Sequence, residues 1–455
     1  MLIKPKRPVP EPIFNFTRPF YHFILAFLGS VIYRFPSRKL YVIGVTGTKG
    51  KTTVSNLIHH ILNSSGMKTG LATTVNFKIG VREWPNKYKQ TMLGRFKLQK
   101  LLRQMVNEGC KYAVIETSSE GILQYRHKFI DYNAAVFLNL FPEHLERHGG
   151  FENYRAAKVK LFEKLACKKD GVGIYNLDDE NVSYFLKPKV NKKIGYSLNP
   201  KSSTGDSHLN YKLQITNYKL NSNGSEFIAN NINYKINLIG EFNVYNAAAA
   251  ICAALSQNIS VEKIQKSLAN FKPVSGRMEI MYAKALTNRH MRIKEDGGDF
   301  TIVIDYAHEP KGLEEVYKAV SDSKLKAQSS KLICILGSAG GGRDKWKRPA
   351  MGKIAAKYCD EIILTNEDPY DENPTLILTE IESGFSQMAN RKWQTGKNYW
   401  KIINRKEAIK KAISLAQKGD VVVLTGKGGE MWMCVENNKK IPWDEKKIVE
   451  EILAG

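Results

Sequence analysis

The chain has 455 residues, of which 43% are hydrophobic and 25% charged, values typical of an ordinary soluble globular protein with room for two or three domains. Lys and Arg number 69 against 44 Asp and Glu, which gives a net charge of +25 and an isoelectric point near 9.6. This excess favours anionic partners such as nucleotides, phosphorylated sugars, an acidic membrane surface or nucleic acid, although a lysine-rich solvated surface would give the same value. No aromatic-basic module accompanies the charge, so we do not expect nucleic acid to be the partner.

The six cysteines lie far apart in the sequence and form no Cys-x-x-Cys pair. We therefore predict free thiols in a reducing cytoplasm, with no zinc site and no disulfide framework. The residues concerned are Cys110, Cys167, Cys252, Cys334, Cys359 and Cys434.

The N-terminus is basic and rich in proline over residues 1–12, which predicts a flexible arm. Residues 20–33 are then apolar over about fourteen positions, and basic residues flank them: Arg18, Arg34, Arg38 and Lys39. A bilayer-spanning helix needs about twenty apolar residues, and no small-residue cleavage site follows this segment. Two alternatives remain, an interfacial membrane helix and a helix packed on the main domain.

A glycine-rich stretch at residues 44–53 (GVTGTKGKTT) organises the first half of the chain. It follows the apolar run at residues 40–43 and precedes helical periodicity at residues 54–62, so we predict a strand, a tight turn and a helix start. In such a loop, backbone N–H groups and the helix N-terminus bind phosphate, Lys51 reaches the outer phosphates, and the Thr52 hydroxyl ligates Mg²⁺. The strict pattern requires glycine where this chain has Val45; a merely structural turn would leave Lys51 without a role.

Strand-like runs and helical stretches alternate after this loop. The alternation predicts an α/β fold with a mostly parallel sheet, helices on both faces, and a ligand site at the carboxyl ends of the strands. The expected strands are residues 68–74, 112–116 and 134–140, and the expected helices are residues 95–108 and 154–165.

The second half of the chain repeats this alternation after a more polar segment. Residues 201–235 alternate polar residues in the manner of antiparallel strands, and a helix is expected at residues 247–256. The turn-rich junction at residues 271–276 marks a domain boundary. Beyond it, the expected strands of a second, Rossmann-like α/β domain are residues 300–305, 332–336, 361–365 and 421–424. We expect an N-terminal segment at 1–39, a P-loop ATPase domain at 40–273 and a C-terminal domain at 274–455.

Polar clusters follow two of the predicted strands, at residues 116–121 and 139–144. Beside a P-loop, the Glu116 carboxylate can complete the coordination of Mg²⁺ together with Thr52. Two roles are open for His144. It could bind a second cation or a phosphate, or it could be a structural or surface histidine.

These segments together resemble the ATP-dependent Mur ligase family of peptidoglycan synthesis, in particular its UDP-N-acetylmuramoyl-tripeptide synthetase branch (MurE-type). The resemblance rests on residues 44–53, 116–119 and 139–162 and covers roughly residues 40 to 432. It continues through residues 240–250 (GEFNVYNAAAA), 275–279 (SGRME), 305–310 (DYAHEP), 341–352 (GGRDKWKRPAMG) and 426–430 (GKGGE).

The resemblance implies a set of site residues. The metal ligands for two Mg²⁺ ions would be Thr52, Glu116, His144 and Lys158, the last as a carbamate. The ATP-binding residues would be Gly47, Thr48, Gly50, Lys51, Thr52, Thr53, Asn243, Asn246, Arg277, Asp305, His308 and Lys345. Those named as catalytic would be Lys51, Lys158, His144 and Arg277, and the substrate-binding residues would be Ser118, Ser119, Arg126, Arg343, Asp368, Lys427 and Glu430. Without the resemblance, Lys158 would be read as a solvated helix residue.

The resemblance also implies a reaction. A substrate carboxylate attacks the γ-phosphate of ATP to give an acyl phosphate, and an amino acid then displaces phosphate to form an amide. The expected partners are a small cell-wall precursor and an amino acid, with a peripheral membrane contact through residues 20–33 as a further possibility. We expect a monomer in the cytoplasm, with association at the inner membrane face as an alternative to a freely dissolved state.

Five departures from the family pattern concern the substrate. The residues before the P-loop are too few for the family's uridine-nucleotide domain, so a lipid-linked or different carboxylate donor becomes an alternative. The Thr-Thr-Pro motif reads Thr-Met-Leu at 91–93, and the Ser-Ser-His motif reads Ser-Ser-Glu at 118–120. The Asp-Asn-Pro-Arg motif of diaminopimelate-adding members reads Glu-Asp-Pro-Tyr at 367–370, which removes the bidentate partner of a distal carboxylate unless Arg343 or Lys427 substitutes. Gly429 replaces the histidine of Gly-Lys-Gly-His-Glu.

Two rival functions follow from these departures. A related ligase of the folylpolyglutamate or cyanophycin type would add an amino acid to another carboxylate. A nucleotide-binding membrane scaffold that has lost catalysis would account for the altered substrate motifs and the apolar N-terminus, but it leaves the retention of Lys51, Glu116 and Lys158 unexplained.

Overall fold

The computed structural model describes residues 11–88, 90–143, 145–199, 209–285, 291–294, 299–323, 325, 329–342, 344–385, 393–437 and 439–454. These residues form two compact units. The first comprises residues up to Phe141, Gly149–Ile215 and Asn246–Ser267, and the second comprises Pro142–His148, Thr216–Tyr245 and the chain from Leu268 onward. The predicted arm at residues 1–12 lies outside the described residues except for Glu11 and Pro12, which begin a helix.

The first unit is built on a mostly parallel sheet in the order β9-β8-β7-β6-β1-β5-β2-β3-β4. Only the edge strands β3 and β4 run antiparallel to their neighbours. The strands are β1 (Tyr41–Thr46), β2 (Thr69–Ala72), β3 (Asn76–Ile79), β4 (Arg82–Pro85), β5 (Tyr112–Glu116), β6 (Tyr132–Phe137), β7 (Val172–Asn176), β8 (Lys192–Ser197) and β9 (Tyr211–Asn221).

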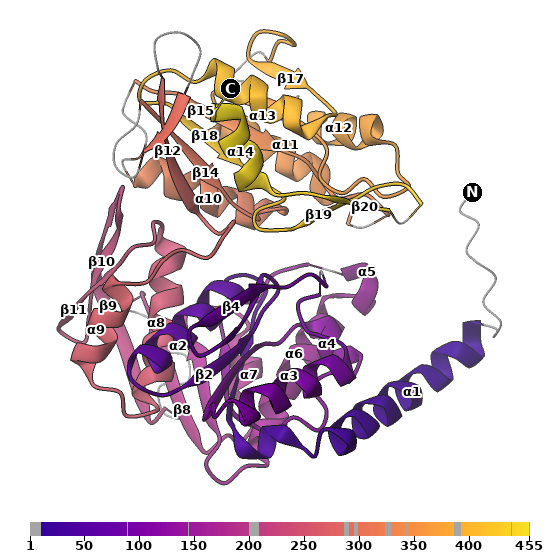
Figure 1. The fold of residues 1–455 in the computed structure, drawn as a ribbon, viewed down its shortest axis with the longest axis vertical. Helices are drawn as coiled ribbons and strands as arrows, with labels where there is room; N and C mark the ends of the chain where they lie inside the picture. Colours follow the sequence, from indigo (N-terminus) through magenta and orange to yellow (C-terminus); the bar gives the residue numbers. More distant parts are fainter. Residues whose placement is uncertain are drawn as a thin grey trace. The chain divides into compact units, whose positions relative to one another are not determined.

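Helices cover both faces of this sheet (Figure 1). Alternate strand residues such as Val42 and Phe137 join one core with α3, α6 and α7, while Ile43 and Val45 face the opposite side, where the buried helix α2 packs. The helices are α1 (Glu11–Ile32), α2 (Lys51–Ser64), α3 (Arg95–Asn107), α4 (Ser119–Leu123), α6 (Phe151–Ala166), α7 (Val182–Leu186), α8 (Glu241–Leu255) and α9 (Val261–Ala269), with a short 3-10 turn η1 (Pro36–Lys39). Helices α8 and α9 and strand β9 run across the division between the units.

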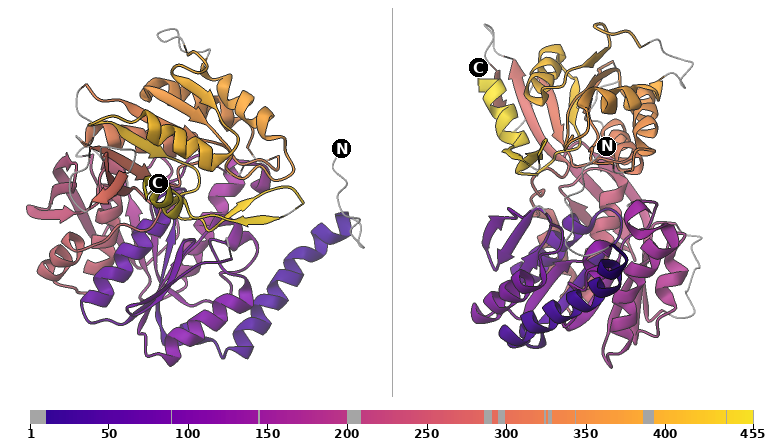
Figure 2. Two further views of the ribbon diagram at one scale, coloured as in Figure 1. Left: turned by 45° about the horizontal axis from the view of Figure 1, so that its top comes forward. Right: turned by 90° about the vertical axis from the view of Figure 1, so that its right-hand side faces the viewer.

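Helix α1 is longer than the apolar segment that predicted it, and its first half extends away from the sheet (Figures 1 and 2). Its second half packs on α3, as the second of the two alternatives predicted. Among the described residues, no helix is long and apolar enough to cross a membrane.

The second unit contains a sheet in the order β13-β12-β14-β18-β15-β16-β17, whose strands from β14 to β17 are parallel. Alternation again divides the core, because Val303 and Val423 face α10–α12 whereas Ile302 and Val422 face α13 and α14. The strands are β10 (Gly224–Ala229), β11 (Ile232–Ile236), β12 (Glu279–Ala285), β13 (Met291–Lys294), β14 (Phe300–Ile304), β15 (Leu332–Leu336), β16 (Glu361–Leu364), β17 (Tyr399–Lys401), β18 (Val421–Leu424), β19 (Trp432–Cys434) and β20 (Lys440–Pro442). The helices are α5 (Leu145–His148), α10 (Pro310–Asp322), α11 (Lys347–Tyr358), α12 (Pro374–Glu382), α13 (Arg405–Leu415) and α14 (Glu445–Ala454).

These sheets confirm the predicted α/β class. The antiparallel strands expected within residues 201–235 are confirmed for β10 and β11. The expectation is wrong for β9, which pairs in parallel with β8, and residues 201–208 lie outside the described residues.

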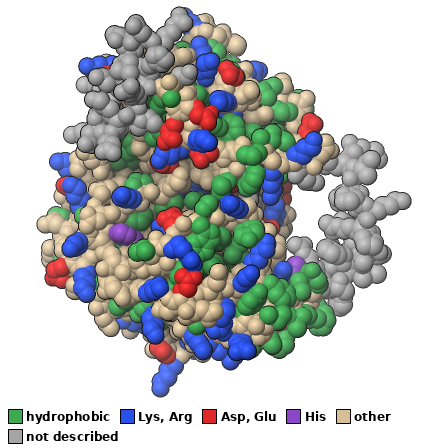
Figure 3. All heavy atoms as spheres, in the orientation of Figure 1, with side chains coloured by type: hydrophobic (Ala, Val, Ile, Leu, Met, Phe, Trp, Pro, Cys, Tyr) green, Lys and Arg blue, Asp and Glu red, His purple; other side chains and the backbone are tan. Residues whose placement is uncertain are grey.

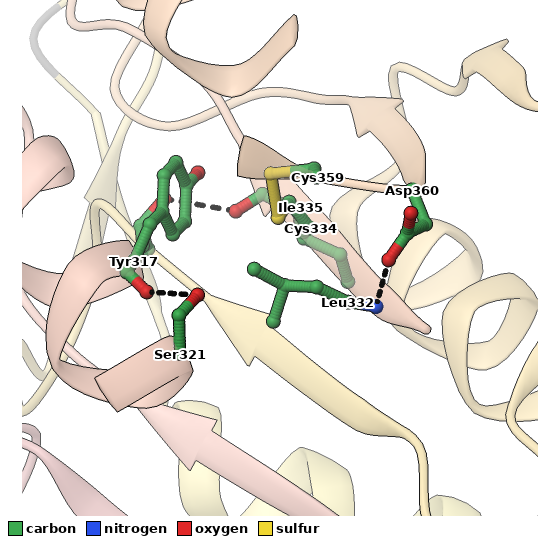
Figure 4. Close-up of a disulfide and its surroundings, with 8 residues drawn as sticks. Tyr317, Ser321, Leu332, Cys334, Ile335, Cys359 and Asp360 are labelled. Carbon is green, nitrogen blue, oxygen red and sulfur yellow. Dashed lines mark hydrogen bonds between the residues drawn. A yellow bond between two sulfur atoms is a disulfide. The ribbon is translucent and has the colours of Figure 1, made fainter. Parts of the chain in front are cut away.

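The prediction of free thiols is wrong for two of the six cysteines, because Cys334 on β15 and Cys359 after α11 form a disulfide (Figure 4). Strands β15 and β16 pair in parallel, and the turn that follows α11 returns the chain to this pair just before β16. This brings together two cysteines whose separation in the sequence gave no signal. The other four cysteines form no disulfide, and all but Cys167 are buried.

Candidate active site

The glycine-rich loop connects β1 to α2 at the carboxyl edge of the first sheet, as predicted. Gly50 caps α2 with a φ of 80°, in the left-handed region that favours glycine. A Cβ atom at this position would lie 2.4 Å from Oδ1 of Asn246, on α8. Both the backbone conformation and the close approach of Asn246 therefore require glycine at residue 50, and they place Asn246 directly against the loop.

Asn139 holds the loop from the neighbouring strand. Its Oδ1 atom accepts the backbone N–H groups of Thr48 at 3.1 Å and Lys49 at 2.9 Å, and its backbone carbonyl oxygen also accepts from Thr48. The Thr48 hydroxyl lies 3.1 Å from the Tyr154 hydroxyl. Sequence reasoning assigned no role to Asn139, although its position just after β6 was the available signal.

Two lysines converge on one backbone carbonyl of the loop. Lys51 Nζ donates to the Gly47 oxygen at 3.1 Å and to the Thr48 oxygen at 2.8 Å. Lys158 Nζ, from α6, donates to the same Gly47 oxygen at 2.7 Å and lies 4.7 Å from the centre of the Tyr154 ring. Lys158 is only 1% exposed, so the solvated helix position suggested by the local sequence is wrong. The arrangement concentrates positive charge on a phosphate-binding loop.

Glu116 lies at the end of β5 and connects the P-loop helix to the loop after β2. Its Oε2 atom accepts from the Thr52 hydroxyl at 2.9 Å and from the backbone N–H of Thr74, and its Oε1 atom accepts from the Thr74 hydroxyl at 3.0 Å. Thr74 is a second residue that sequence reasoning missed. Hydroxyl and carboxylate oxygens are the donors that Mg²⁺ prefers, so this pair fits the predicted ion. No group of three or more His, Cys, Asp or Glu side chains suited to a metal was found where side chains are described.

The other residues predicted for the first unit lie around this edge. Ser118 caps α4 by accepting from the Gly121 N–H at 3.1 Å, and Ser119 is the first residue of that helix and is buried. Arg126 donates to the backbone oxygen of Met92, and burial lowers the pKa of its guanidinium. Thr53 is buried in the first turn of α2.

His144 and Arg343 lie outside the described residues. Asn243 belongs to the second unit, where its side chain donates to the Ile239 oxygen at 2.8 Å.

The second unit gathers a second polar cluster after β16 and β18, around Lys427. The Lys427 ammonium donates to Asp368 Oδ1 at 3.0 Å, to Glu430 Oε2 at 2.7 Å and to the Trp432 oxygen at 2.7 Å. Three acceptors match the three N–H groups of a lysine, and the side chain is fully buried. Lys427 therefore fixes the two carboxylates that the sequence predicted for substrate binding.

Tyr306 joins this cluster to Arg277. Its hydroxyl donates to Glu430 Oε1 at 3.1 Å, and the Arg277 guanidinium lies 4.3 Å from the centre of its ring. Burial raises the pKa of the Tyr306 hydroxyl well above its ordinary value, so the group remains a donor. Burial likewise raises the pKa of the adjacent Glu367 to about 7.

Asp305, His308 and Lys345 lie in loops of the same unit. Asp305 accepts from the backbone N–H groups of Met278 at 2.8 Å and Ala307 at 2.7 Å. His308 Nδ1 donates to the Tyr306 oxygen at 2.8 Å, and its Nε2 atom lies 3.5 Å from Glu143 Oε1. Lys345 forms an ion pair of 2.8 Å with Glu372.

Comparison with known proteins gives two family matches. Residues 45–254 match the model described as Mur ligase middle domain, and residues 288–428 match the model described as Mur ligase, glutamate ligase domain. The chain is 37% identical over 435 residues to UDP-N-acetylmuramoyl-L-alanyl-D-glutamate--2,6-diaminopimelate ligase 1 of Clostridium acetobutylicum, covering 94% of this chain and 81% of that protein. It is 34% identical to UDP-N-acetylmuramyl-tripeptide synthetase of Roseiflexus sp. (strain RS-1), covering 94% and 82%.

Solved structures agree with these matches. A UDP-N-acetylmuramoyl-L-alanyl-D-glutamate--2,6-diaminopimelate ligase superposes with a TM-score of 0.58 at 29% identity, covering 91% of this chain and 78% of that one. The folylpolyglutamate synthase of Mycobacterium tuberculosis, solved with ADP and AMPPCP, superposes with a TM-score of 0.66 at 15% identity, covering 89% and 92%. The second likeness concerns the fold alone.

Proposed function

Because the chain belongs to the Mur ligase family, we propose that it is an ATP-dependent ligase that joins an amino acid to the carboxyl group of a UDP-N-acetylmuramoyl-peptide-like cell-wall precursor. The observation that carries the proposal is the convergence of Lys51 and Lys158 on Gly47, beside the Thr52–Glu116 pair. A nucleotide-binding scaffold has no need for a second, buried lysine on the phosphate loop. ATP and Mg²⁺ are general requirements of the family.

The reaction proceeds in two steps. A carboxylate oxygen of the precursor attacks the γ-phosphate of ATP, ADP leaves, and an acyl phosphate forms. The amine of the amino acid then attacks the acyl carbon, phosphate leaves, and the amine loses a proton as the amide forms. Both steps gather negative charge near the loop, where Lys51, the backbone N–H groups and the α2 N-terminus stabilise it.

Two Mg²⁺ ions belong to this proposal. Thr52 and Glu116 would hold one, and His144 and a carbamylated Lys158 would contribute to the second. Bound ions neutralise phosphate charge and polarise the transferred phosphoryl group. Carbamylation would replace one of two neighbouring cations by an anion that a metal can bind, which gives the burial of Lys158 against Gly47 a purpose.

We assign the polar cluster of the second unit to the amino acid and the nucleotide. Asp368 and Glu430, whose carboxylates are held by Lys427, would bind the incoming amino acid. Arg343, two residues before Lys345 in the sequence, would also bind substrate. Arg277, Asp305, His308 and Lys345 would act on the nucleotide together with Asn243 and Asn246, while Ser118, Ser119 and Arg126 would bind the precursor.

The domain division proposed is an N-terminal segment at 1–39, an ATP-binding domain at 40–273 and a C-terminal domain at 274–455. The family matches at 45–254 and 288–428 support it. We further propose that the chain acts as a monomer on small molecules in the cytoplasm, and that residues 20–33 contact the inner face of the membrane.

The test is ATP-dependent phosphate release with UDP-N-acetylmuramoyl-dipeptide as precursor and each amino acid in turn, with the product identified by mass. One amino acid should stimulate release and appear in the product. Lys51→Ala should lower turnover about a hundredfold or more, because a preorganised charge contact contributes about 3 kcal/mol to the transition state. Lys160→Ala, an exposed lysine on α6, is the control and should keep full activity. The proposal would be refuted if none of the amino acids stimulated phosphate release. It would also be refuted if the Lys51→Ala variant kept more than a tenth of the wild-type turnover.

A further inference from the structure

Helix α1 packs with its small residues inward and its large apolar residues outward. The side that faces the protein carries Ala26, Gly29 and Ser30, which are buried. Eight large apolar side chains are nevertheless exposed: Phe20, Tyr21, Phe23, Ile24, Phe27, Leu28, Val31 and Ile32. Of these, Phe23 and Phe27 lie at the border of the exposed side, because their rings also contact the ring of Phe129 at 5.2 Å and 5.5 Å between centres. Figure 3 shows these hydrophobic side chains gathered over α1 at the lower right of the molecule. A helix whose only role was to cover the domain would bury its large residues instead.

The inward face makes specific contacts that fix this orientation. A Cβ atom at Gly29 would lie 3.5 Å from Cα of Phe96, so the backbones of α1 and α3 approach closely. The guanidinium of Arg103 on α3 donates to the Tyr33 oxygen at 2.7 Å and to the Arg34 oxygen at 2.9 Å. His22 and Arg95 also form a hydrogen bond. Rotating α1 to bury its large residues would break these contacts.

The exposed fractions on this face are large. Phe20 is 69% exposed and Ile32, three turns further along the helix, is 61% exposed. Leaving so many apolar side chains in water is costly, and contiguous apolar patches on soluble proteins usually mark an interaction site. The patch is therefore a docking surface.

The charges around the patch indicate what docks there. The sequence from Pro12 to Arg82 contains no Asp or Glu. Arg34, Arg38 and Lys39 follow the apolar face directly and are exposed, and Lys97 and Lys100 are exposed on α3. An apolar face bordered by these cations complements a surface that is negatively charged outside and apolar beneath, which is the surface of an anionic lipid bilayer.

The geometry points to α1 as an in-plane membrane anchor, and we propose that its exposed apolar residues insert into an anionic bilayer while the basic residues around it bind lipid phosphates. Residues 20–32 extend over about 20 Å, shorter than the roughly 30 Å hydrocarbon core, so the helix lies along the interface. This deepens the membrane contact proposed above. It does not depend on the ligase chemistry, because none of the anchor residues is assigned to the reaction.

The experiment is flotation of the full-length protein with vesicles of phosphatidylglycerol and phosphatidylcholine, compared with vesicles of phosphatidylcholine alone. We expect binding to the anionic vesicles, at least tenfold weaker binding to the neutral ones, and weakening by salt. The variant Phe20→Ser/Leu28→Ser/Ile32→Ser should bind anionic vesicles at least about a hundredfold more weakly. These three side chains are exposed, so their replacement should leave the fold and the phosphate-release activity with soluble precursor unchanged.

The matched control is Val81→Ser/Leu376→Ser/Ile441→Ser, which removes three exposed apolar side chains elsewhere and should bind vesicles normally. Equal loss in the two triple variants, or equal binding to neutral and anionic vesicles, would overturn the proposal. A further outcome would also overturn it: the wild type forms a dimer without vesicles, and the α1 triple variant does not. The patch would then be an interface between two copies of the chain. A chain that binds vesicles but releases no phosphate would refute the ligase alone.

Discussion

Lys158 lies 111 residues beyond Gly47 in the chain, and its Nζ atom donates to the Gly47 carbonyl oxygen at 2.7 Å. The lysine comes from the middle of α6, and the carbonyl belongs to the phosphate loop after β1. Lys51 donates to the same oxygen, so the loop is held between two ammonium groups. This relationship distinguishes the site from a P-loop with one lysine and gives the first prediction.

Lys158→Arg should lower the turnover number about a hundredfold or more, because arginine keeps the charge but does not form the carbamate assigned to residue 158. Steady-state phosphate release is the measurement. Lys160→Arg, on the exposed side of the same helix, should leave it unchanged. In ¹³CO₂-enriched buffer, a carbamate carbon signal should appear in the wild type and in Lys160→Arg and be absent from Lys158→Arg. A signal that persists in Lys158→Arg would assign the carbamate elsewhere.

Asn139→Ala should weaken ATP binding about tenfold or more. The substitution removes the side-chain acceptor of the Thr48 and Lys49 N–H groups, and each such bond contributes about 1 kcal/mol to holding the loop. Calorimetric titration with a non-hydrolysable nucleotide gives the dissociation constant. Asn153→Ala on α6 provides the comparison, because that side chain is exposed and its amide donates to the Gly149 oxygen. Equal affinities for wild type and Asn139→Ala would mean that the loop holds its shape without the clamp.

Much of the fold could be predicted from the sequence because its strands are buried on both faces. The strands at residues 112–116, 332–336 and 421–424 were predicted at their observed bounds, since each is a continuous apolar run that ends where polar residues begin. The β3–β4 hairpin was missed, because β4 is largely exposed and carries no apolar run. Helix α8 begins six residues before its predicted start at 247, because apolar Phe242 and Val244 extend the helical pattern.

The site was predictable only where its residues form a recognisable motif in the local sequence. Residues 44–53 carry their own signal. The comparisons confirm the family resemblance, and the remaining site positions that it implied stay predictions. Asn139 and Thr74 act through hydrogen bonds to residues far away in the sequence, and no local pattern records such bonds. The burial of Lys158 depends on the packing of α6 against the sheet, which periodicity alone does not decide for a lysine.

Glu445→Ala should lower the free energy of unfolding by about 3 to 5 kcal/mol. It would leave the Arg405 guanidinium, which is fully buried and forms an ion pair of 2.5 Å with the Glu445 carboxylate, without its charge partner. Urea unfolding measures the change. Glu451→Ala breaks the ion pair between Lys406 and Glu451, which is half exposed and joins the same two helices, and should cost less than about 1 kcal/mol. Similar losses in the two variants would show that the buried pair has no special role.

Glu367 should make the protein less stable as the pH rises from about 4.5 to about 7. Its pKa is raised to about 7 in the folded protein by burial, from an ordinary value of 4.5, so the folded state binds more protons than the unfolded state within this window. The free energy of unfolding therefore falls with pH there and levels off above pH 7. Glu367→Gln should remove this component, which amounts to at most about 3 kcal/mol. Urea midpoints of the two proteins should converge near pH 4.5 and separate towards pH 8, and parallel curves would contradict the assignment.

The disulfide between Cys334 and Cys359 should stabilise the second unit by about 3 kcal/mol, because it closes a loop of 25 residues in the unfolded chain. Reduction should therefore lower the midpoint of thermal unfolding by several degrees. Cys334→Ala/Cys359→Ala should have the lower midpoint from the start and no longer respond to reductant, whereas Cys110→Ala/Cys434→Ala should respond as the wild type does. Thiol titration of the unreduced protein in denaturant gives an independent measure, since the bond leaves four of the six cysteines reactive. Six reactive thiols would mean that the two cysteines lie in contact without being bonded, and the reductant would then leave the wild-type midpoint where it is.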